Sequence, residues 1–197
     1  MTDDHGSRPL IVLLTGEPGS GKRTLGTELS LAMRLPFVSR DDMRGGLYFS
    51  VGAWTDSPGT IPSADQAVET FLRIVETHAE LGVSCLAEYI ARSHRPEDLR
   101  RLDAAGRLVV IETWCSNPEE RVIRRNHEDR LVNRRPVLDA LGYATNEDHT
   151  SALVDRMRAV TKEMQTEFDV PSLRVNCDDG HEPTLDAIID WIAGQAS

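Results

Sequence analysis

A segment near the N-terminus combines closely spaced glycines with one lysine, and these residue types at this spacing suit phosphate binding. Residues 16–24 read GEPGSGKRT. Gly16, Gly19 and Gly21 let the backbone curl so that successive N–H groups point at phosphate oxygens. Lys22 then stands at the start of the next helix, where its compact cation can reach the β- and γ-phosphates. The pattern GxxxxGK predicts a Walker A loop, and a glycine-rich turn without a function is the alternative.

The residue after this lysine departs from the usual Walker A pattern. Arg23 stands where a Ser or Thr normally ligates Mg²⁺, and Thr24 follows it. Loops of the adenylate-kinase type, which run GxPGxGKGT, also lack the first hydroxyl and keep the second. We therefore expect ATP to bind here, with Ser20, Arg23 and Thr24 joining the glycines and Lys22 in the nucleotide site. We expect Mg²⁺ to be held through water or mainly by acidic side chains, with Thr24 as one candidate ligand.

Two adjacent aspartates follow the second expected strand, in the segment Ser39-Arg-Asp-Asp-Met-Arg44. The C-terminal ends of parallel strands form a ligand crevice in this type of architecture. A carboxylate there can accept a hydroxyl proton while a phosphoryl group is transferred. Capping of a helix is the alternative for both Asp41 and Asp42.

With these two motifs in place, the chain resembles P-loop kinases of the nucleoside/nucleotide-kinase superfamily that carry an (R)DDxR element after the second strand. They include 5′-hydroxyl polynucleotide kinases, with zeta-toxin-like and chloramphenicol-phosphotransferase-like relatives. The resemblance follows the order of elements over nearly the whole chain, with specific motifs at residues 16–24, 41–44 and about 121–136. It implies that Asp41 is the general base and that Arg44 holds the acceptor or a phosphate.

Two further features follow strands two and three. Residues 45–54 mix glycines with aromatic residues, and we interpret them as part of an acceptor pocket, with core packing as the alternative. Glu88 ends the third strand, where it could hold a water ligand of Mg²⁺ or the acceptor. A carboxylate with only a structural hydrogen-bonding role is the alternative for Glu88.

Arginines are concentrated in residues 121–135, which hold Arg121, Arg124, Arg125, Arg130, Arg134 and Arg135. Kinases of the type resembled place a lid helix here, whose arginines close over the triphosphate. Arginine suits that task because its planar fork binds phosphate in a bidentate manner. The resemblance favours Arg125 and Arg130 as catalytic charge stabilisers and Arg121 as a partner for adenine. A solvated helix, with glutamates and aspartates interspersed, is the alternative.

Apolar runs alternate with amphipathic segments of helical length along the chain. We expect strands at 9–15, 36–39, 83–87, 107–114 and 172–176. Helices are expected at about 21–34, 63–81, 95–105, 151–168 and 184–193, with another starting at Asn117-Pro118, while 41–62 is expected to be irregular. Strands separated by helices indicate a parallel sheet covered on both faces. The sequence thus predicts one P-loop NTPase domain over residues 1–197, a three-layer α/β/α fold with about five strands and an arginine-rich helical lid at about 117–145.

The net charge, the apolar runs and the cysteines of the chain indicate which classes of partner it binds and where in the cell it is found. The formal net charge is −10, which disfavours long nucleic acid and anionic membrane surfaces. No apolar run is long enough for a transmembrane helix, and the polar start is no signal peptide. The three cysteines lack CxxC spacing, so a disulfide framework is not expected and the cytoplasm is the natural setting.

These observations lead to a ranked set of hypotheses. The first is a Mg²⁺-dependent kinase that moves the γ-phosphoryl of ATP to a hydroxyl of a small molecule, such as a nucleoside, a sugar or an antibiotic-like acceptor. The second is a polynucleotide 5′-hydroxyl kinase, favoured by residues 40–44 and disfavoured by the charge. The third is a regulatory module that binds a nucleotide without transferring phosphate, for which Arg23 is the best support.

Overall fold

The computed structural model describes residues 8–50, 63–121 and 148–195, with the backbone alone described at 148–153. Five strands form one sheet in the order β2-β3-β1-β4-β5. They are β1 (Leu10–Gly16), β2 (Phe37–Ser39), β3 (Cys85–Glu88), β4 (Arg107–Trp114) and β5 (Ser172–Asn176). All four pairings between neighbours are parallel, which confirms the expected parallel sheet. Because β1 is central, the loop that follows it opens at the middle of the sheet's C-terminal edge.

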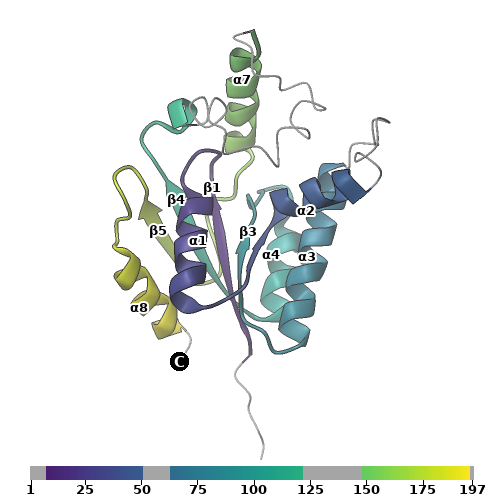
Figure 1. The fold of residues 1–197 in the computed structure, drawn as a ribbon, viewed down its shortest axis with the longest axis vertical. Helices are drawn as coiled ribbons and strands as arrows, with labels where there is room; N and C mark the ends of the chain where they lie inside the picture. The colour runs from purple at the N-terminus through teal and green to yellow at the C-terminus, as the bar shows by residue number, and fades with distance from the viewer. Residues whose placement is uncertain (1–7, 51–62, 122–147, 196–197) are drawn as a thin grey trace, which may run out of the picture.

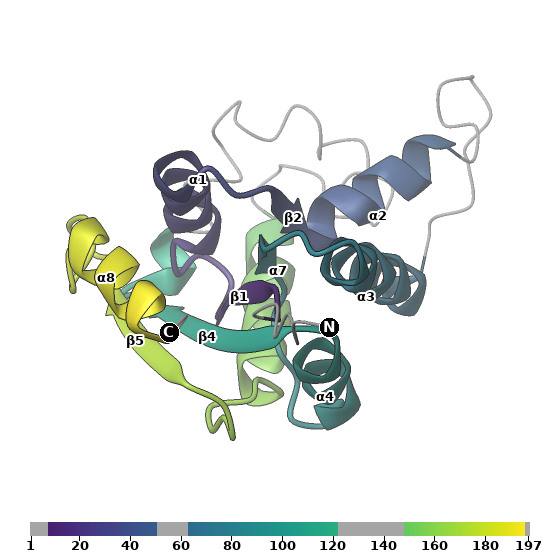
Figure 2. The ribbon, with the colours of Figure 1, turned by 90° about the horizontal axis from the view of Figure 1, so that it is seen from below.

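Helices cover both faces of this sheet (Figure 1). Helices α1 (Lys22–Met33) and α8 (Leu185–Gln195) lie on one face, and α3 (Ala64–Glu80) and α4 (Pro96–Ala105) lie on the other. The view from below separates the three layers (Figure 2). Helix α7 (Asp148–Lys162) stands above the C-terminal ends of the strands, with α2 (Arg40–Tyr48) beside α3. The architecture is therefore the three-layer α/β fold expected from the sequence.

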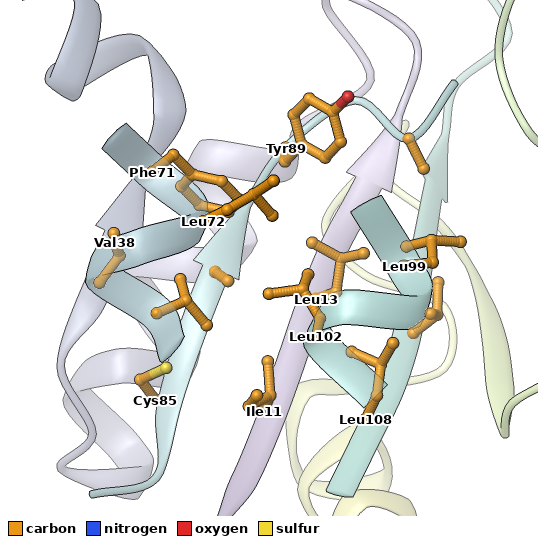
Figure 3. Close-up of a cluster of buried hydrophobic side chains, with 14 of the residues drawn as sticks. Ile11, Leu13, Val38, Phe71, Leu72, Cys85, Tyr89, Leu99, Leu102 and Leu108 are labelled. Carbon is orange, nitrogen blue, oxygen red and sulfur yellow. The ribbon is translucent and has the colours of Figure 1, made fainter. Parts of the chain in front are cut away.

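Alternation along β1 explains the two cores. Ile11 and Leu13 point into one apolar cluster, which Figure 3 shows together with Phe71, Leu72 and Leu102 of the covering helices. Leu10, Val12 and Leu14 point into the cluster on the opposite face, which α1 and α8 cover. Successive side chains of a strand point to opposite faces, so a strand buried on both sides reads as a continuous apolar run.

Local sequence signals account for where several helices begin. The hydroxyl of Ser63 accepts a hydrogen bond from the Gln66 backbone N–H, and the Gln66 side chain accepts one from the Ser63 N–H. This capping box starts α3. Helix α4 starts with Pro96 at its first turn, where the missing N–H costs nothing. A helical turn also begins at Pro118, as expected from the Asn117-Pro118 pair.

Two expected elements differ from the structure. Residues 41–48, expected to be irregular, belong to α2, which begins directly after β2. The two glycines in that segment suggested a loop, although glycine costs a helix only about 1 kcal/mol, and the helix forms because it packs against α3. The long helix expected at 151–168 begins earlier and ends at Lys162, because the chain then pairs with residues 91–93. The lid expected at 117–145 lies largely outside the described residues.

Among the described residues, no helix is long and apolar enough to cross a membrane.

Candidate nucleotide and acceptor site

The loop between β1 and α1 is the predicted Walker A segment, and its glycines are required by the backbone. Gly16, Gly19 and Gly21 have φ angles of 136°, 85° and 94°, values that side chains with a Cβ rarely adopt. At Gly21 a Cβ would also stand 2.8 Å from the Cβ of Cys177. At Gly16 a Cβ would collide with the carbonyl oxygen of Thr113. Both the turn and its close approach to β4 and β5 therefore depend on glycine.

Lys22 is buried within this loop. Its side chain folds back so that Nζ donates hydrogen bonds to the carbonyl oxygens of Gly16, at 2.8 Å, and Glu17, at 2.7 Å. The residue is 7% exposed. A buried ammonium is costly unless it is paired, and the two loop carbonyl oxygens supply partners for this cation at the start of α1. Such an arrangement suits a phosphate.

Ser20 braces the loop through its side chain. Its Oγ lies 2.7 Å from Oγ1 of Thr113, and Thr113 donates its proton to the carbonyl oxygen of Thr15. Ser20 must then be the donor to Thr113. The Ser20 hydroxyl is thus engaged by β4, and the Ser20 backbone N–H is itself hydrogen-bonded to Glu17. The place of Ser20 in the nucleotide site remains a prediction. The sequence does not indicate the contact with Thr113, because the two residues are 93 positions apart in the chain.

Arg23 links the phosphate loop to the segment after β2. One guanidinium nitrogen, Nη2, lies 2.6 Å from Oδ2 of Asp42. The other, Nη1, lies 3.9 Å from Oε2 of Glu88. Glu88 is buried and accepts a 2.6 Å hydrogen bond from the Ser39 hydroxyl. The structure therefore brings Arg23, Asp42 and Glu88 together at the C-terminal edge of the sheet.

This cluster bears on the predicted Mg²⁺ site. Among the described residues, no group of three or more His, Cys, Asp and Glu side chains is placed to hold a metal ion. Thr24 is exposed, and Arg23 lies against both nearby carboxylates. Mg²⁺ commonly keeps several waters and binds one or two carboxylates together with substrate phosphates. Mg²⁺ stays a prediction here, and Glu88 and Asp42 are the carboxylates near Arg23 that would meet a nucleotide-borne Mg²⁺ ion through water.

The two aspartates after β2 face different partners. Neither is the N-cap of α2; Ser39 occupies that position, and acidic residues in the first turn complement the helix dipole. Asp42 pairs with Arg23 of the phosphate loop, whereas Oδ1 of Asp41 lies 2.9 Å from Nη1 of Arg40. Asp41, which the sequence analysis favoured as the general base, is therefore paired with an arginine of α2.

Arg44 lies one turn beyond Arg40 on α2. Its Nε is buried and has no hydrogen-bond partner among the described residues. Burial lowers the pKa of Arg44, and the nearby guanidinium groups of Arg40 and Arg156 lower it further, while Asp41 acts in the opposite direction. Asp41 and Arg44 are three residues apart on α2, and their roles as general base and acceptor clamp stay predictions.

Arg121 lies on the other side of the phosphate loop, beyond β4 and β5. Its Nη2 donates a 2.6 Å hydrogen bond to the carbonyl oxygen of Asp178. The Asp178 carboxylate accepts hydrogen bonds from the Ser116 hydroxyl and N–H, and these bonds lower its pKa. A Cβ on Gly21 would be 3.9 Å from Nη1 of Arg121. Arg121 therefore flanks the loop, and its contact with adenine stays a prediction.

Several predicted residues lie outside the described ranges. Arg125 and Arg130, with most of the lid, belong to residues 122–147, and the aromatic stretch 45–54 is described only to residue 50. In the described part Tyr48 is buried, and its ring meets Phe49 edge-on with centroids 5.4 Å apart. The interpretation of this stretch as part of an acceptor pocket stays a prediction.

The fold occurs in several solved proteins. A Chloroflexus aurantiacus protein described as a "putative kinase" superimposes with a TM-score of 0.67 at 20% identity, over 96% of this chain and 99% of that one. An unliganded sugar kinase from Janibacter sp. HTCC2649 superimposes with a TM-score of 0.55 at 13% identity, over 94% of each chain. Kti12 from Chaetomium thermophilum, in complex with ADP-AlF3, superimposes with a TM-score of 0.56 at 18% identity, over 96% of this chain and all of that one.

No family model matches the sequence, and no curated protein matches it either. The likeness is therefore one of overall fold. The chain has the fold of P-loop kinase-like proteins.

Proposed function

We propose that the protein is an ATP-dependent kinase that transfers the γ-phosphoryl group to a hydroxyl of a small molecule. The observation that carries the proposal is the connection between the two motifs. The phosphate loop with its buried Lys22 is joined to the aspartate-bearing start of α2 by the 2.6 Å pair between Arg23 and Asp42. Phosphoryl transfer mainly requires positioning and charge stabilisation, and a phosphate site next to a carboxylate supplies both.

On the donor side, Lys22 and the loop amides hold the phosphates. The Lys22 ammonium exchanges the carbonyl oxygens of Gly16 and Glu17 for β- and γ-phosphate oxygens. Glu88 and Asp42 would hold a Mg²⁺ ion through water, and that ion would supply neutralisation of part of the phosphate charge. The arginines of the lid segment, Arg125 and Arg130, are proposed as further charge stabilisers.

On the acceptor side, Asp41 is the proposed general base. Asp42 is paired with Arg23, whereas Asp41 is paired with Arg40 and acts electrostatically on Arg44. A hydroxyl placed against Asp41 would pass its proton to the carboxylate as the phosphoryl group arrives. Arg44 would hold the acceptor in line.

Consumption of ATP in the presence of a panel of alcohols, sugars, nucleosides and hydroxy acids tests this proposal. Asp41→Asn should lower kcat by about 10²-fold or more and leave the Kd for ATP within twofold of wild type. Asp103→Asn, an exposed change on α4, is the matched control and should keep full turnover. Lys22→Ala should abolish ATP binding. ATP binding that survives Lys22→Ala would refute the assigned nucleotide site, and full turnover in Asp41→Asn would refute the base.

A second candidate is a nucleotide-binding module that transfers no phosphate. The observation in its favour is Arg23, which replaces the usual metal-ligating Ser or Thr and whose guanidinium lies between Asp42 and Glu88. Such a module would bind ATP with normal affinity and consume none with any acceptor, and Asp41→Asn would change nothing. A 5′-hydroxyl oligonucleotide belongs in the same panel, although the net charge of −10 opposes a long nucleic acid.

A further inference from the structure

The side chain of Arg23 crosses from the phosphate loop to the segments that follow β2 and β3. Arg23 lies in the first turn of α1. The carboxylates that it approaches are Asp42, in the first turn of α2, and Glu88, at the end of β3. The sheet order β2-β3-β1-β4-β5 places the end of β3 between the phosphate loop and the start of α2. The guanidinium therefore lies in the interval that separates the donor side from the acceptor side.

One nitrogen of this guanidinium has no hydrogen-bond partner among the described residues. Nη2 is paired with Oδ2 of Asp42 at 2.6 Å, whereas Nη1 is buried and makes no hydrogen bond to the described part of the chain. Its separation of 3.9 Å from Oε2 of Glu88 is too long for one, and that oxygen accepts the 2.6 Å hydrogen bond of the Ser39 hydroxyl instead. A buried donor without a protein partner is unfavourable, and an incoming ligand atom can remove that cost.

The guanidinium as a whole can be reached from solvent. The side chain of Arg23 is 36% exposed and that of Asp42 is 43% exposed, so the pair borders open space although Nη1 is covered. An exposed ion pair contributes little to stability, and the approach of Nη1 to Glu88 adds no hydrogen bond. A small rotation of the guanidinium toward an anion would therefore cost little and would give Nη1 a partner.

Lys22 and Arg23 place two cations on different sides of the N-terminus of α1. Successive residues of a helix point in different directions around its axis. The Lys22 side chain folds back onto carbonyl oxygens of the loop, while Arg23 reaches the start of α2. A phosphate bound at this helix N-terminus would have Lys22 on the loop side. Arg23 would stand on the side of the proposed base Asp41, which directly precedes Asp42, and the γ-phosphoryl group moves toward that side during transfer.

We propose that Arg23 is a catalytic residue, which binds the γ-phosphoryl group through Nη1 and stabilises its negative charge during transfer to the acceptor hydroxyl. This inference rests on the proposed kinase function. In that step the bond from the γ-phosphorus to the bridging oxygen breaks, and ADP leaves with the electron pair. A bond forms from the acceptor oxygen to the phosphorus, and the hydroxyl proton passes to Asp41. Negative charge is spread over the phosphoryl oxygens in the transition state, where a guanidinium donor is most effective.

The test compares two nucleotides that differ in the γ-phosphoryl group. Calorimetry at saturating Mg²⁺ gives the Kd of ADP and the Kd of the β,γ-imido analogue of ATP, which is not hydrolysed. Arg23→Gln should weaken the analogue about tenfold or more, the usual effect of losing a charge-assisted hydrogen bond, and leave the Kd of ADP within twofold. Arg23→Lys keeps the charge, so its Kd for the analogue should lie between those of wild type and Arg23→Gln. Arg73→Gln also removes an exposed ion pair, the one with Glu69 on α3, and as the matched control it should change neither Kd.

The outcomes separate this inference from the kinase function. If wild type binds neither nucleotide, the nucleotide site and the kinase function are both refuted. If Arg23→Gln weakens ADP as much as the analogue, or weakens neither, Arg23 does not touch the γ-phosphoryl group and this inference alone is overturned. With an acceptor that the panel shows to be phosphorylated, Arg23→Gln should also lower kcat by about 10²-fold or more, and an unchanged kcat would overturn the inference as well. Circular dichroism checks that Arg23→Gln is folded, and Arg23→Lys gives the same comparison if it is not.

Discussion

Arg23 stands at the sequence position that a metal-ligating Ser or Thr has in most phosphate loops, and its guanidinium reaches beyond it. It contacts Asp42 directly and stands 3.9 Å from Glu88, so a positive charge already lies next to the two carboxylates proposed to meet Mg²⁺. The pair with Asp42 is partly exposed, and exposed pairs contribute about 0–1 kcal/mol to stability. Its main effect is therefore on the electrostatics of the site.

Arg23→Ser should make nucleotide binding depend more strongly on Mg²⁺. The change restores a hydroxyl and removes the cation that competes for Asp42 and Glu88, so less Mg²⁺ should be needed for half-maximal ATP binding, while affinity without Mg²⁺ falls. Calorimetric titration at a series of Mg²⁺ concentrations measures both. Arg73→Ser, which removes the exposed pair with Glu69 on α3, is the control. An identical Mg²⁺ dependence in wild type and Arg23→Ser would disprove this role for Arg23.

Gly21→Ala should damage both folding and nucleotide binding. The new Cβ would meet Cys177 at 2.8 Å in a residue with φ of 94°, so we expect a loss of about 1–3 kcal/mol of unfolding free energy and a large loss of ATP affinity. Urea unfolding and calorimetry measure the two effects. Gly194→Ala in α8, where a Cβ meets nothing within 4 Å, should be neutral or slightly stabilising. Equal stability of the two variants would contradict the argument.

At the scale of elements, helices α3 and α4 are joined by a charged network. Arg101 of α4 contacts both Glu69 and Glu76 of α3, with distances from its Nη1 and Nε of 2.7 Å and 2.8 Å. Hydrogen bonds from Arg101 and Arg73 lower the pKa of Glu69 from 4.5 to about 2. The group is exposed, so solvent screening reduces the stability that this shift represents.

Because the pKa of the Glu69 carboxyl is lower in the folded state than in the unfolded state, the free energy of unfolding decreases at acid pH. The contribution of Glu69 is present above its unfolded pKa of 4.5 and is lost as the pH falls through about 2. Arg101→Gln should therefore narrow the difference in unfolding free energy between pH 5 and pH 3, measured with urea. Arg100→Gln on the same helix should leave that difference as in wild type. If the two variants lose stability in parallel, the network does not account for the acid dependence.

Elements were predictable from sequence where a periodic pattern is strong. Buried strands appear as apolar runs, and Ser63 with Gln66 marks the start of α3 by local chemistry alone. Helix α2 was missed because Gly45 and Gly46 suggested a loop, while its packing against α3 depends on tertiary structure. Sheet order was not predictable, since it depends on which strands pair.

The candidate site was predictable only where its residues are neighbours in the chain. The phosphate loop and the segment 39–44 were found because a motif holds each together. Thr113, which braces Ser20, and Arg156, whose charge acts on Arg44, contribute from remote segments. No local pattern distinguishes these residues from surface polar residues, so only the fold identifies them.

At the scale of the whole molecule, all three cysteines are buried and none is in a disulfide. Burial raises the pKa of Cys85 and of Cys177 to about 11, and burial also raises that of Cys115. The reactive thiolate is therefore scarce near neutral pH. Labelling with a thiol-specific disulfide reagent should be slow in the native protein and should reach three thiols in concentrated guanidinium chloride. Fast labelling of a thiol in the native state would show that the segments that bury this thiol open readily.

The contact between the end of α7 and the segment after β3 is made by main-chain atoms of Ala91, Ser93, Glu163 and Gln165. Such hydrogen bonds do not depend on which side chains the residues carry. Arg92 and Glu163 lie within this seam, so either can be exchanged while the backbone pairing persists. The backbone pairing thus determines the shape of the proposed acceptor side. The side chains there determine its charge, and they can be replaced. On the proposed kinase function, related chains could change the acceptor they prefer through a few substitutions there, without a change of fold.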